Sequence, residues 1–293
     1  MSGKRQSTGI SALDKMLGGG LLPGTLTVVV GATGIGKTQL GVQYAHAGLA
    51  QEGKRGIFFD TTARGDSQNH PEYAKRLADW DLSVVDTEEQ PILEPFFEAP
   101  PAGEYLHVFD YRGRRVTRRD LDWDDWQTWQ AQLNSRLRSA IAFLYGHFIR
   151  GVQRVVLDGI EPADRPSESI QFHLLEYVYQ QVLRKDFDWV ARDLFREQYR
   201  KFETQVLAHP YLPASIGSLL LATSHETMLD ELIRKPLSEG DILSNANTII
   251  LMGKQQQGNR VGRALQIAKH RGSYCDDQIV PYRVTETGIE LDL

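Results

Sequence analysis

Residues 31–38 of the chain read Gly-Ala-Thr-Gly-Ile-Gly-Lys-Thr, and this stretch decides the fold. It matches the P-loop pattern, in which two glycines with four residues between them are followed by Lys and by Ser or Thr. The apolar run 25–30 precedes it and a helical pattern at 39–45 follows, which is the strand–loop–helix context that the motif requires. Glycines let the backbone turn its N–H groups inward around phosphate oxygens. The pattern predicts nucleotide binding, and the alternative is a glycine-rich turn without a ligand.

Within this segment each residue type has an expected task. Lys37 is expected to reach the β- and γ-phosphates of ATP, and the Thr38 hydroxyl is expected to hold Mg²⁺. The amino end of the following helix adds the positive end of its dipole. The predicted nucleotide-binding residues are Gly31, Ala32, Thr33, Gly34, Ile35, Gly36, Lys37, Thr38 and Gln39.

A second motif lies far downstream of the P-loop. Residues 154–158 read Arg-Val-Val-Leu-Asp, a hydrophobic strand that ends in an acid, which is the Walker B pattern. Such an aspartate orders the water shell of Mg²⁺. We therefore predict that Asp158 contacts the metal through water. The alternative is a strand-end aspartate that caps the next helix.

Composition limits the classes of protein to which the chain can belong. Its 293 residues are 41% hydrophobic and 24% charged, with a formal net charge of −5, as in a globular protein with a sizeable core. The charge does not favour nucleic acid as a partner. The single cysteine, Cys275, excludes an intramolecular disulfide framework and fits a cytoplasmic location. No signal peptide or membrane-spanning apolar run is expected.

Short apolar runs alternate with helical patterns, which predicts an α/β fold with a mainly parallel, twisted sheet flanked by helices. The strands are expected at 25–30, 56–60, 106–110, 152–158, 219–223 and 248–252. After Met252, short strands at 263–269, 280–285 and 289–291 predict an antiparallel extension at one edge of the sheet.

The chain is expected to be one domain, residues 1–293, with three insertions. Residues 83–105 are rich in proline and predict an irregular surface excursion. Residues 112–129 begin with arginines and continue with aspartates and tryptophans. Residues 185–215 carry aromatic residues among charges, which predicts an extended helix.

Several further segments resemble the RecA superfamily of ATPases, especially its KaiC and RadA branches. They are the entry segment 7–24, Asp79–Leu82 after a helix, the strand-end segment 220–226, the strand 247–251 and the late strand 263–272, which ends in Lys-His-Arg-Gly. The resemblance runs from about Thr8 to Leu293, and it implies a RecA-like core.

The resemblance also implies an assembly. Family members form rings, usually hexamers, with ATP between subunits, and a Lys-x-Arg pair reaches the γ-phosphate of the neighbouring subunit. Here that pair is Lys269 and Arg271. Two cations beside the transferred phosphoryl group would offset its charge; otherwise they are solvated charges on an edge strand. Thr223, Ser224 and His225 would either sense the γ-phosphate or only cap a strand end.

One position departs from the family pattern. Members carry a catalytic glutamate at the end of the strand after the first helix, where this chain has Asp60, Thr61, Thr62 and Ala63. Thr62 stands at the glutamate position in one register, and Thr62 and Ala63 in the other. A threonine hydroxyl is a poor base. Asp60, Asp66 and Glu161 are candidate substitutes, with Asp60 ranked first, and we expect slow hydrolysis or none.

Three functions remain open at this point. The first is a KaiC-like regulatory or signalling ATPase, and the second is a RadA-like recombinase. The third is a scaffold that uses ATP only to assemble. The loops that would bind single-stranded DNA, 159–166 and 226–241, are acidic rather than basic, so nucleic acid is not the expected partner.

Trp123, Trp126 and Trp129 recur at a helical spacing, so they lie roughly on one face. The favoured interpretation is packing against the core or a covering role. The alternative is an exposed patch that binds a protein partner.

Overall fold

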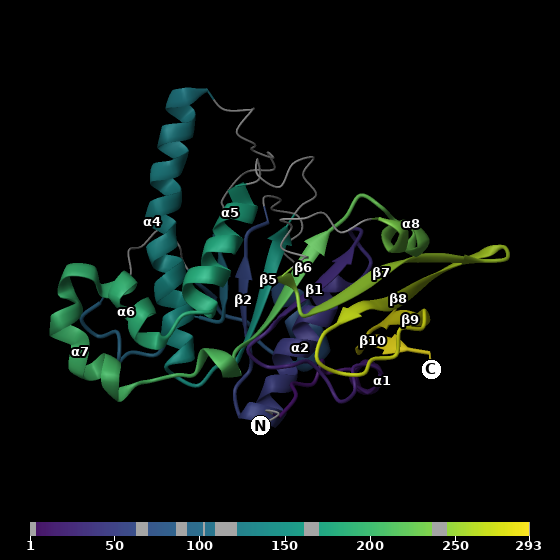
Figure 1. The fold of residues 1–293 in the computed structure, drawn as a ribbon, viewed down its shortest axis with the longest axis horizontal. Coiled ribbons are helices and arrows are strands. Elements are labelled where there is room, and N and C mark those ends of the chain that lie inside the picture. The colour runs from purple at the N-terminus through teal and green to yellow at the C-terminus, as the bar shows by residue number, and fades with distance from the viewer. Residues whose placement is uncertain are drawn as a thin grey trace.

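Ten strands form one sheet in the computed structural model of the chain (Figure 1). The structure describes residues 4–62, 70–85, 93–101, 103–108, 122–160, 170–235 and 245–292. The strands are β1 (Leu26–Gly31), β2 (Ile57–Asp60), β3 (Val84–Val85), β4 (Tyr105–His107), β5 (Arg154–Ile160), β6 (Gly217–Thr223), β7 (Thr248–Gln257), β8 (Arg260–His270), β9 (Val280–Thr285) and β10 (Gly288–Leu291).

The order across the sheet is β10-β9-β8-β7-β1-β6-β5-β2-β4-β3. The strands from β7 to β3 in this order are parallel, and β8, β9 and β10 are antiparallel. β6 lies between the P-loop strand β1 and strand β5, which carries Asp158. This arrangement confirms the predicted α/β class, the mainly parallel sheet and the antiparallel extension, and it is consistent with a RecA-like P-loop core.

Helices cover both faces of the parallel part of the sheet (Figure 1). They are α1 (Ser11–Met16), α2 (Lys37–Glu52), α3 (His70–Ala78), α4 (Trp123–Phe148), α5 (Ile170–Tyr177), α6 (Phe187–Phe195), α7 (Tyr199–Ala208) and α8 (Leu229–Arg234). Among the helices of the described ranges, none has the length and apolar character needed to span a bilayer.

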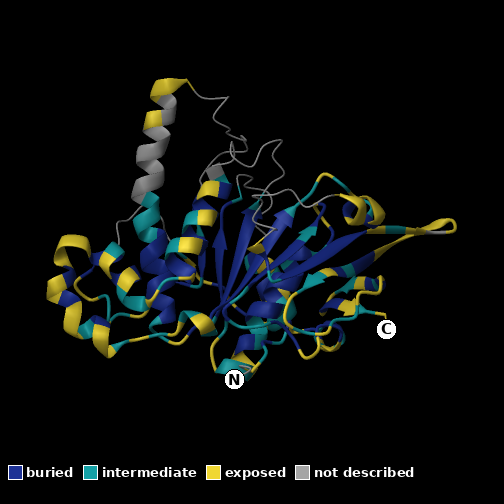
Figure 2. Ribbon diagram, viewed as in Figure 1, coloured by how far each residue is buried: buried dark blue, intermediate teal, exposed yellow. Residues whose placement is uncertain are grey.

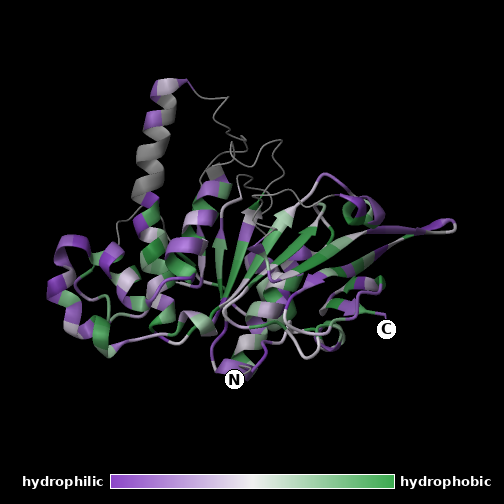
Figure 3. Cartoon of the chain, viewed as in Figure 1, coloured by the Kyte–Doolittle hydropathy of each residue, from purple (hydrophilic) through white to green (hydrophobic). Residues whose placement is uncertain are grey.

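Alternation along the central strands builds two separate cores. On β1, Val28 packs into the cluster that contains α4 to α7, and its neighbour Val29 packs into the cluster that contains α1, α2 and α3. Successive side chains of a strand point to opposite faces, so a strand covered on both sides is apolar throughout. The central strands are accordingly buried in Figure 2 and hydrophobic in Figure 3.

Strand ends differ from the predictions by a few residues, and two differences are larger. β7 and β8 continue well past the predicted ends as a two-stranded hairpin, which projects from the sheet in Figure 1. The range 83–105 contains a strand, β3, which was not predicted. With only two residues, Val84 and Val85, at the sheet edge beside β4, it leaves no periodic pattern in the sequence.

The extended helix predicted at 185–215 is wrong. The segment contains two helices, α6 and α7, which pack against each other and are separated at Arg196, where φ is +47°. The break lets both helices bury aromatic residues, since the Phe195 and Phe202 rings lie 4.6 Å apart. Phe96, from the first predicted insertion, packs edge-on against the Phe195 ring at 5.5 Å. These two ranges therefore share one helical lobe beside the sheet.

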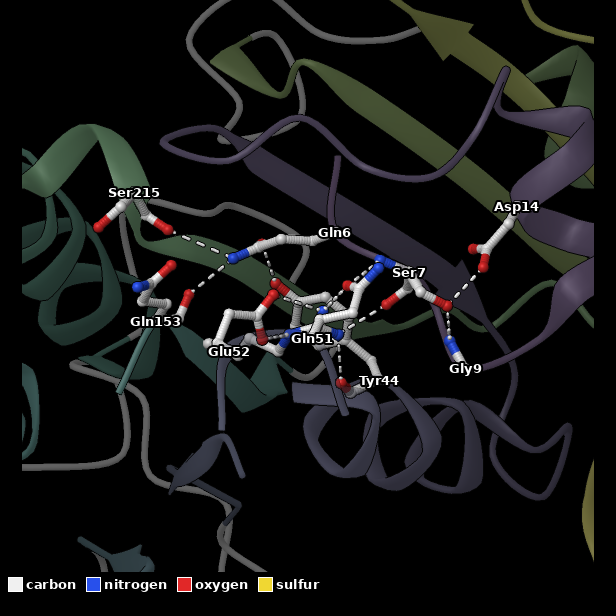
Figure 4. Close-up of polar contacts among 10 residues, drawn as sticks. Gln6, Ser7, Gly9, Asp14, Tyr44, Gln51, Glu52, Gln153 and Ser215 are labelled. Carbon is white, nitrogen blue, oxygen red and sulfur yellow. Dashed lines mark hydrogen bonds and ion pairs between the residues drawn. The ribbon is translucent and has the colours of Figure 1, made fainter. Parts of the chain in front are cut away.

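A buried arginine ties the amino-terminal segment to this core. Arg154 is fully buried at the start of β5, and it donates to both carboxylate oxygens of Glu52 at 2.8 and 2.9 Å. It also donates to the carbonyl oxygens of Ser7 at 2.6 Å and Tyr44 at 2.7 Å, and to the side-chain oxygen of Gln51. Figure 4 shows the surrounding network, in which Gln6 reaches the carbonyl oxygens of Gln153 and Ser215.

Candidate functional site

The P-loop joins β1 to α2 in the predicted way. Gly34 and Gly36 adopt positive φ angles of 78° and 113°, which favour glycine. A Cβ on Gly34 would meet nothing within 4 Å, so the loop leaves space above it. α2 begins at Lys37, and its first N–H groups have no partner within the helix. The loop therefore has the conformation and the free donors that phosphate oxygens require.

Lys37 lies inside this loop. Its Nζ donates to the carbonyl oxygens of Gly31 at 2.8 Å and Ala32 at 2.9 Å. Burial lowers the pKa of Lys37 to about 8, although the negative charge of Asp158 acts in the opposite direction. The ammonium group is thus held by weak neutral acceptors in a site from which most water is excluded, which is a favourable setting for a bound anion.

The carboxy-terminal extension braces the same loop from beneath. The hydroxyl of Tyr282 on β9 donates to the carbonyl oxygen of Ile35 at 2.8 Å. A Cβ on Gly36 would approach Val284 Cγ2 at 3.2 Å and Ile289 Cδ1 at 3.4 Å. Burial raises the pKa of Tyr282, which keeps its hydroxyl protonated as a donor. The extension therefore helps to define the loop, a role that the sequence did not reveal.

Asp158 and Thr38 lie close together beside the P-loop. The Thr38 hydroxyl lies 3.5 Å from Asp158 Oδ2, at the limit of a hydrogen bond. Asp158 Oδ1 accepts from the N–H of Gly159 at 2.7 Å. Gly159 has a φ of 107°, and a Cβ there would lie 2.4 Å from the Thr62 nitrogen, so glycine is required for close packing of β5 against β2.

Asp60 lies next to Asp158 in the register of β2 and β5 and is fully buried. Its Oδ1 accepts from the N–H of Thr62 at 2.7 Å, and its Oδ2 accepts from the hydroxyl of Tyr105 at 2.5 Å. Both oxygens therefore accept hydrogen bonds that hold Asp60 within the core. The buried hydroxyl of Thr62, by contrast, has no hydrogen-bond partner among the residues that the structure describes.

His70, which the sequence analysis did not single out, completes this group. Its Nε2 lies 3.0 Å from Asp158 Oδ2 and its Nδ1 lies 3.8 Å from Asp60 Oδ2, with the ring fully buried. Burial alone would lower the pKa of His70. The hydrogen bond with Asp158 and the charges of Asp60 and Asp158 together outweigh burial and raise it. No local sequence pattern distinguishes His70, because it comes close to Asp60 and Asp158 only in the folded chain.

The residues at the carboxyl end of β6 and directly after it contact one another and the P-loop strand β1. Thr223 pairs with Gly31 in the register of β6 and β1, and the N–H of Ser224 donates to the Gly31 carbonyl oxygen at 3.1 Å. The Ser224 hydroxyl donates to Glu226. This bond and the Lys235 ion pair at 2.9 Å lower the pKa of Glu226 to about 2. Thr223 and Ser224 thus lie at the P-loop edge, and the sensing role stays a prediction.

Lys269 and Arg271 lie away from the P-loop of their own chain. Lys269 pairs with Ile249, and the N–H of Arg271 donates to the Asn247 carbonyl oxygen, so both lie at the amino ends of the parallel strands. The P-loop lies at the carboxyl ends, roughly 15 Å further along the sheet at ~3.3 Å per residue. Burial and the charge of Arg271 lower the pKa of Lys269.

Comparison with known proteins connects this geometry to a family. A protein-family model described as "ATPase: KaiC" matches residues 6–168, more than half of the chain and a range that includes both the P-loop and Asp158. The chain belongs to the KaiC family of ATPases. Its fold and its P-loop are those of the ATP-binding RecA superfamily, as the sequence resemblance implied.

Individual relatives agree with this assignment. The circadian clock oscillator protein KaiC of Thermostichus vulcanus is 28% identical over 99% of this chain and 43% of its own length. The circadian clock protein KaiC2 of a Synechocystis strain is 24% identical over 97% of this chain and 39% of its own length. The DNA repair protein RadA of Mycobacterium tuberculosis is 45% identical over 51 residues, 17% of this chain and 10% of its own length. The chain thus spans less than half the length of these relatives.

The residues of this KaiC-family chain fit a magnesium nucleotide. The P-loop supplies donors and Lys37, and Thr38 and Asp158 supply oxygens on one side of it. Among the described residues, no group of three or more His, Cys, Asp or Glu side chains could hold a metal by itself. Mg²⁺ in nucleotide sites is held by one or two protein ligands, water and phosphates, so this sparse donor set is the expected one.

Several predicted residues lie outside what the structure describes. These are Asp66, Glu161, residues 112–121 and the side chains of Trp126 and Trp129. Trp123, at the start of α4, is 65% exposed, so the favoured prediction that it packs against the core or covers it is wrong for this residue. Its polar neighbours Asp122 and Asp124 are also exposed.

Proposed function

We propose that this KaiC-family chain binds Mg-ATP, assembles into a homo-oligomeric ring with nucleotide at the subunit interfaces, and hydrolyses ATP slowly. The observation that carries the proposal is the meeting of Thr38 and Asp158 beside an intact P-loop, with Thr62 where family members have a glutamate. Such a site retains the groups for binding and lacks the group for water activation. A regulatory or signalling role, in which the bound nucleotide sets the assembly state, follows from this combination.

The binding roles are distributed over few residues. Gly31 to Gln39 would surround the phosphates, with Lys37 on the β- and γ-phosphates. Thr38 would bind Mg²⁺, and Asp158 would order its water. The metal supplies positive charge that offsets the phosphate oxygens. Asp60, with both oxygens engaged in the core, would support the site more readily than it would abstract a proton.

Hydrolysis should be slow, and a glutamate at position 62 should accelerate it. In single-turnover assays we expect wild type to be slower than a KaiC-family protein that carries the glutamate. Thr62→Glu should raise the rate by ~10²-fold, the lower end of what a general base contributes. Thr62→Gln is the matched control, because it has similar size but no basic group. A wild-type rate equal to that of the comparison protein, and unchanged in Asp60→Asn, would contradict slow turnover.

The pair Lys269 and Arg271 should act on the nucleotide of a neighbouring subunit. Arg271→Ala and Lys37→Ala should each reduce hydrolysis to background, whereas mixing the two variants should restore activity at about a quarter of the interfaces of a randomly mixed ring. Phosphate release by the mixture, compared with each variant alone, measures this. Arg263→Ala, on the same strand but at an exposed position, is the control. The absence of any recovery in mixed rings would argue against action in trans.

Two alternatives make different predictions for the same protein. A scaffold that does not hydrolyse ATP would change size with ATP and release no phosphate. A RadA-like recombinase, which the 45% identity over 51 residues brings into consideration, would bind labelled single-stranded DNA in a salt-dependent way. The described part of the segment after β6, which includes α8, carries Arg234 and Lys235 against Glu226, Asp230 and Glu231, and it therefore offers little attraction for phosphates.

A further inference from the structure

A buried histidine links the two acidic strands of the site. His70, the first residue of α3, is fully buried, and it contacts Asp158 on β5 through Nε2 at 3.0 Å. Its Nδ1 faces Asp60 on β2 at 3.8 Å. Asp60 and Asp158 are neighbours in the β2–β5 register, so the imidazole joins two carboxylates that the sheet holds side by side.

The direction of the short contact is fixed by chemistry. An ionised carboxylate only accepts hydrogen bonds, so His70 Nε2 must carry a proton and donate to Asp158 Oδ2. The Thr38 hydroxyl lies 3.5 Å from the same oxygen, Asp158 Oδ2. The other oxygen, Oδ1, accepts from the Gly159 N–H at 2.7 Å. The orientation of the Asp158 carboxylate is therefore set by one backbone donor and by His70.

The ring of His70 is itself held in place. It packs edge-on against Phe58 with 5.3 Å between ring centroids, and it lies tilted against Tyr105 at 5.1 Å. The hydroxyl of Tyr105 donates to Asp60. The rings of Tyr105 and His70 therefore lie in a continuous series of contacts between Asp60 and Asp158. An imidazole fixed by packing holds its hydrogen bond in one direction, as the outer groups of metal sites do.

We propose that His70 is a positioning residue, which orients Asp158 toward Thr38 and so makes nucleotide binding depend on Mg²⁺. This inference rests on the proposed function, since it assigns a task to Asp158 at the metal. His70 acts through Asp158 and lies within the core, so it is not a catalytic residue. The sequence motifs of the site do not include His70, because this residue comes close to Asp158 only in the folded chain.

The test compares nucleotide affinity with and without the metal. Kd for ATP is measured by calorimetry in excess Mg²⁺ and again in EDTA, for wild type and variants at position 70. His70→Gln retains a donor near the place of Nε2, whereas His70→Asn retains one only near the place of Nδ1. We expect His70→Asn and His70→Phe to weaken binding in Mg²⁺ by about 10–100-fold and to leave the EDTA value unchanged, with His70→Gln close to wild type.

A control and the opposing outcomes separate this role from a structural one. Tyr105→Phe removes the donor to Asp60 but leaves the ring against His70, and it should keep the Mg²⁺ dependence of wild type. Equal losses in Mg²⁺ and in EDTA, or equal behaviour of the Gln and Asn variants, would overturn the proposal. If wild type itself binds ATP equally well without Mg²⁺, the proposed metal site fails, and the role of His70 fails with it. If His70→Phe does not fold, the Gln and Asn pair decides.

Discussion

Replacing Arg154 with methionine is expected to lower the free energy of unfolding by about 3–5 kcal/mol, the range for breaking a buried ion pair on one side. Arg154 is fully buried and bonded to Glu52, Ser7, Tyr44 and Gln51. Methionine fills most of the volume but donates no hydrogen bond. The Glu52 carboxylate, whose side chain is 12% exposed, then loses its partner without regaining full hydration. Urea unfolding followed by circular dichroism measures the change.

An exposed ion pair supplies the matched control. Lys201 Nζ lies 3.0 Å from Glu94 Oε1, a similar distance, but both side chains are more than half exposed. Lys201→Met should change the stability by less than about 1 kcal/mol, because water and mobility offset the attraction at the surface. Similar losses for Arg154→Met and Lys201→Met would show that the buried network is not what holds the amino-terminal segment.

The Arg154 network also bears on the site. Arg154 begins β5 and Asp158 lies four residues later on the same strand, whereas Glu52 ends α2, the helix that Lys37 begins. The arginine therefore joins the carboxyl end of α2 to the amino end of β5. Lys37 and Asp158 lie toward the opposite ends of these two elements. We infer that Arg154 is buried because it fixes the position of α2 relative to β5, since a charged group in a core otherwise costs free energy.

Local signals explain what could be predicted from the sequence. The P-loop requires glycines and a lysine at set positions, and the central residues of the strands β1, β5 and β6 are apolar because both faces of these strands are covered. The α/β class followed from these features, and the family was indicated by the resemblance of further segments, such as the entry segment 7–24. Asp158 was predicted for the same reason, since an acid at the end of an apolar run is visible in the sequence.

Contacts between distant segments explain what could not be predicted. His70 and Asp158 are 88 residues apart, and Tyr282 and Ile35 are 247 residues apart. No spacing rule connects such pairs, so the donor to Asp158 and the brace beneath the P-loop appear only in the structure. The break between α6 and α7 has a similar origin. It occurs at Arg196 without a glycine or proline, and aromatic packing across the bend decides it.

Replacing Lys37 with alanine should abolish ATP binding at concentrations that saturate wild type. Loss of a buried, hydrogen-bonded charge that faces an anion costs about 2–5 kcal/mol, or roughly 30- to 5,000-fold in Kd. The donors of the P-loop would remain, but the residual affinity would be too weak to fill the site. Fluorescence anisotropy of a labelled ATP analogue, with unlabelled ATP as competitor, measures the loss.

Stability separates this loss from misfolding. Among the described residues, Lys37 donates only to the carbonyl oxygens of Gly31 and Ala32, and burial lowers its pKa to about 8, so its charge opposes folding rather than supports it. Without nucleotide, Lys37→Ala should therefore unfold at the same urea concentration as wild type or a higher one. ATP should raise the wild-type midpoint and leave that of the variant unchanged, because a ligand stabilises only the state that binds it. A variant that loses stability without ligand, or that gains it with ATP, would show that Lys37 is a structural residue rather than the phosphate-binding lysine.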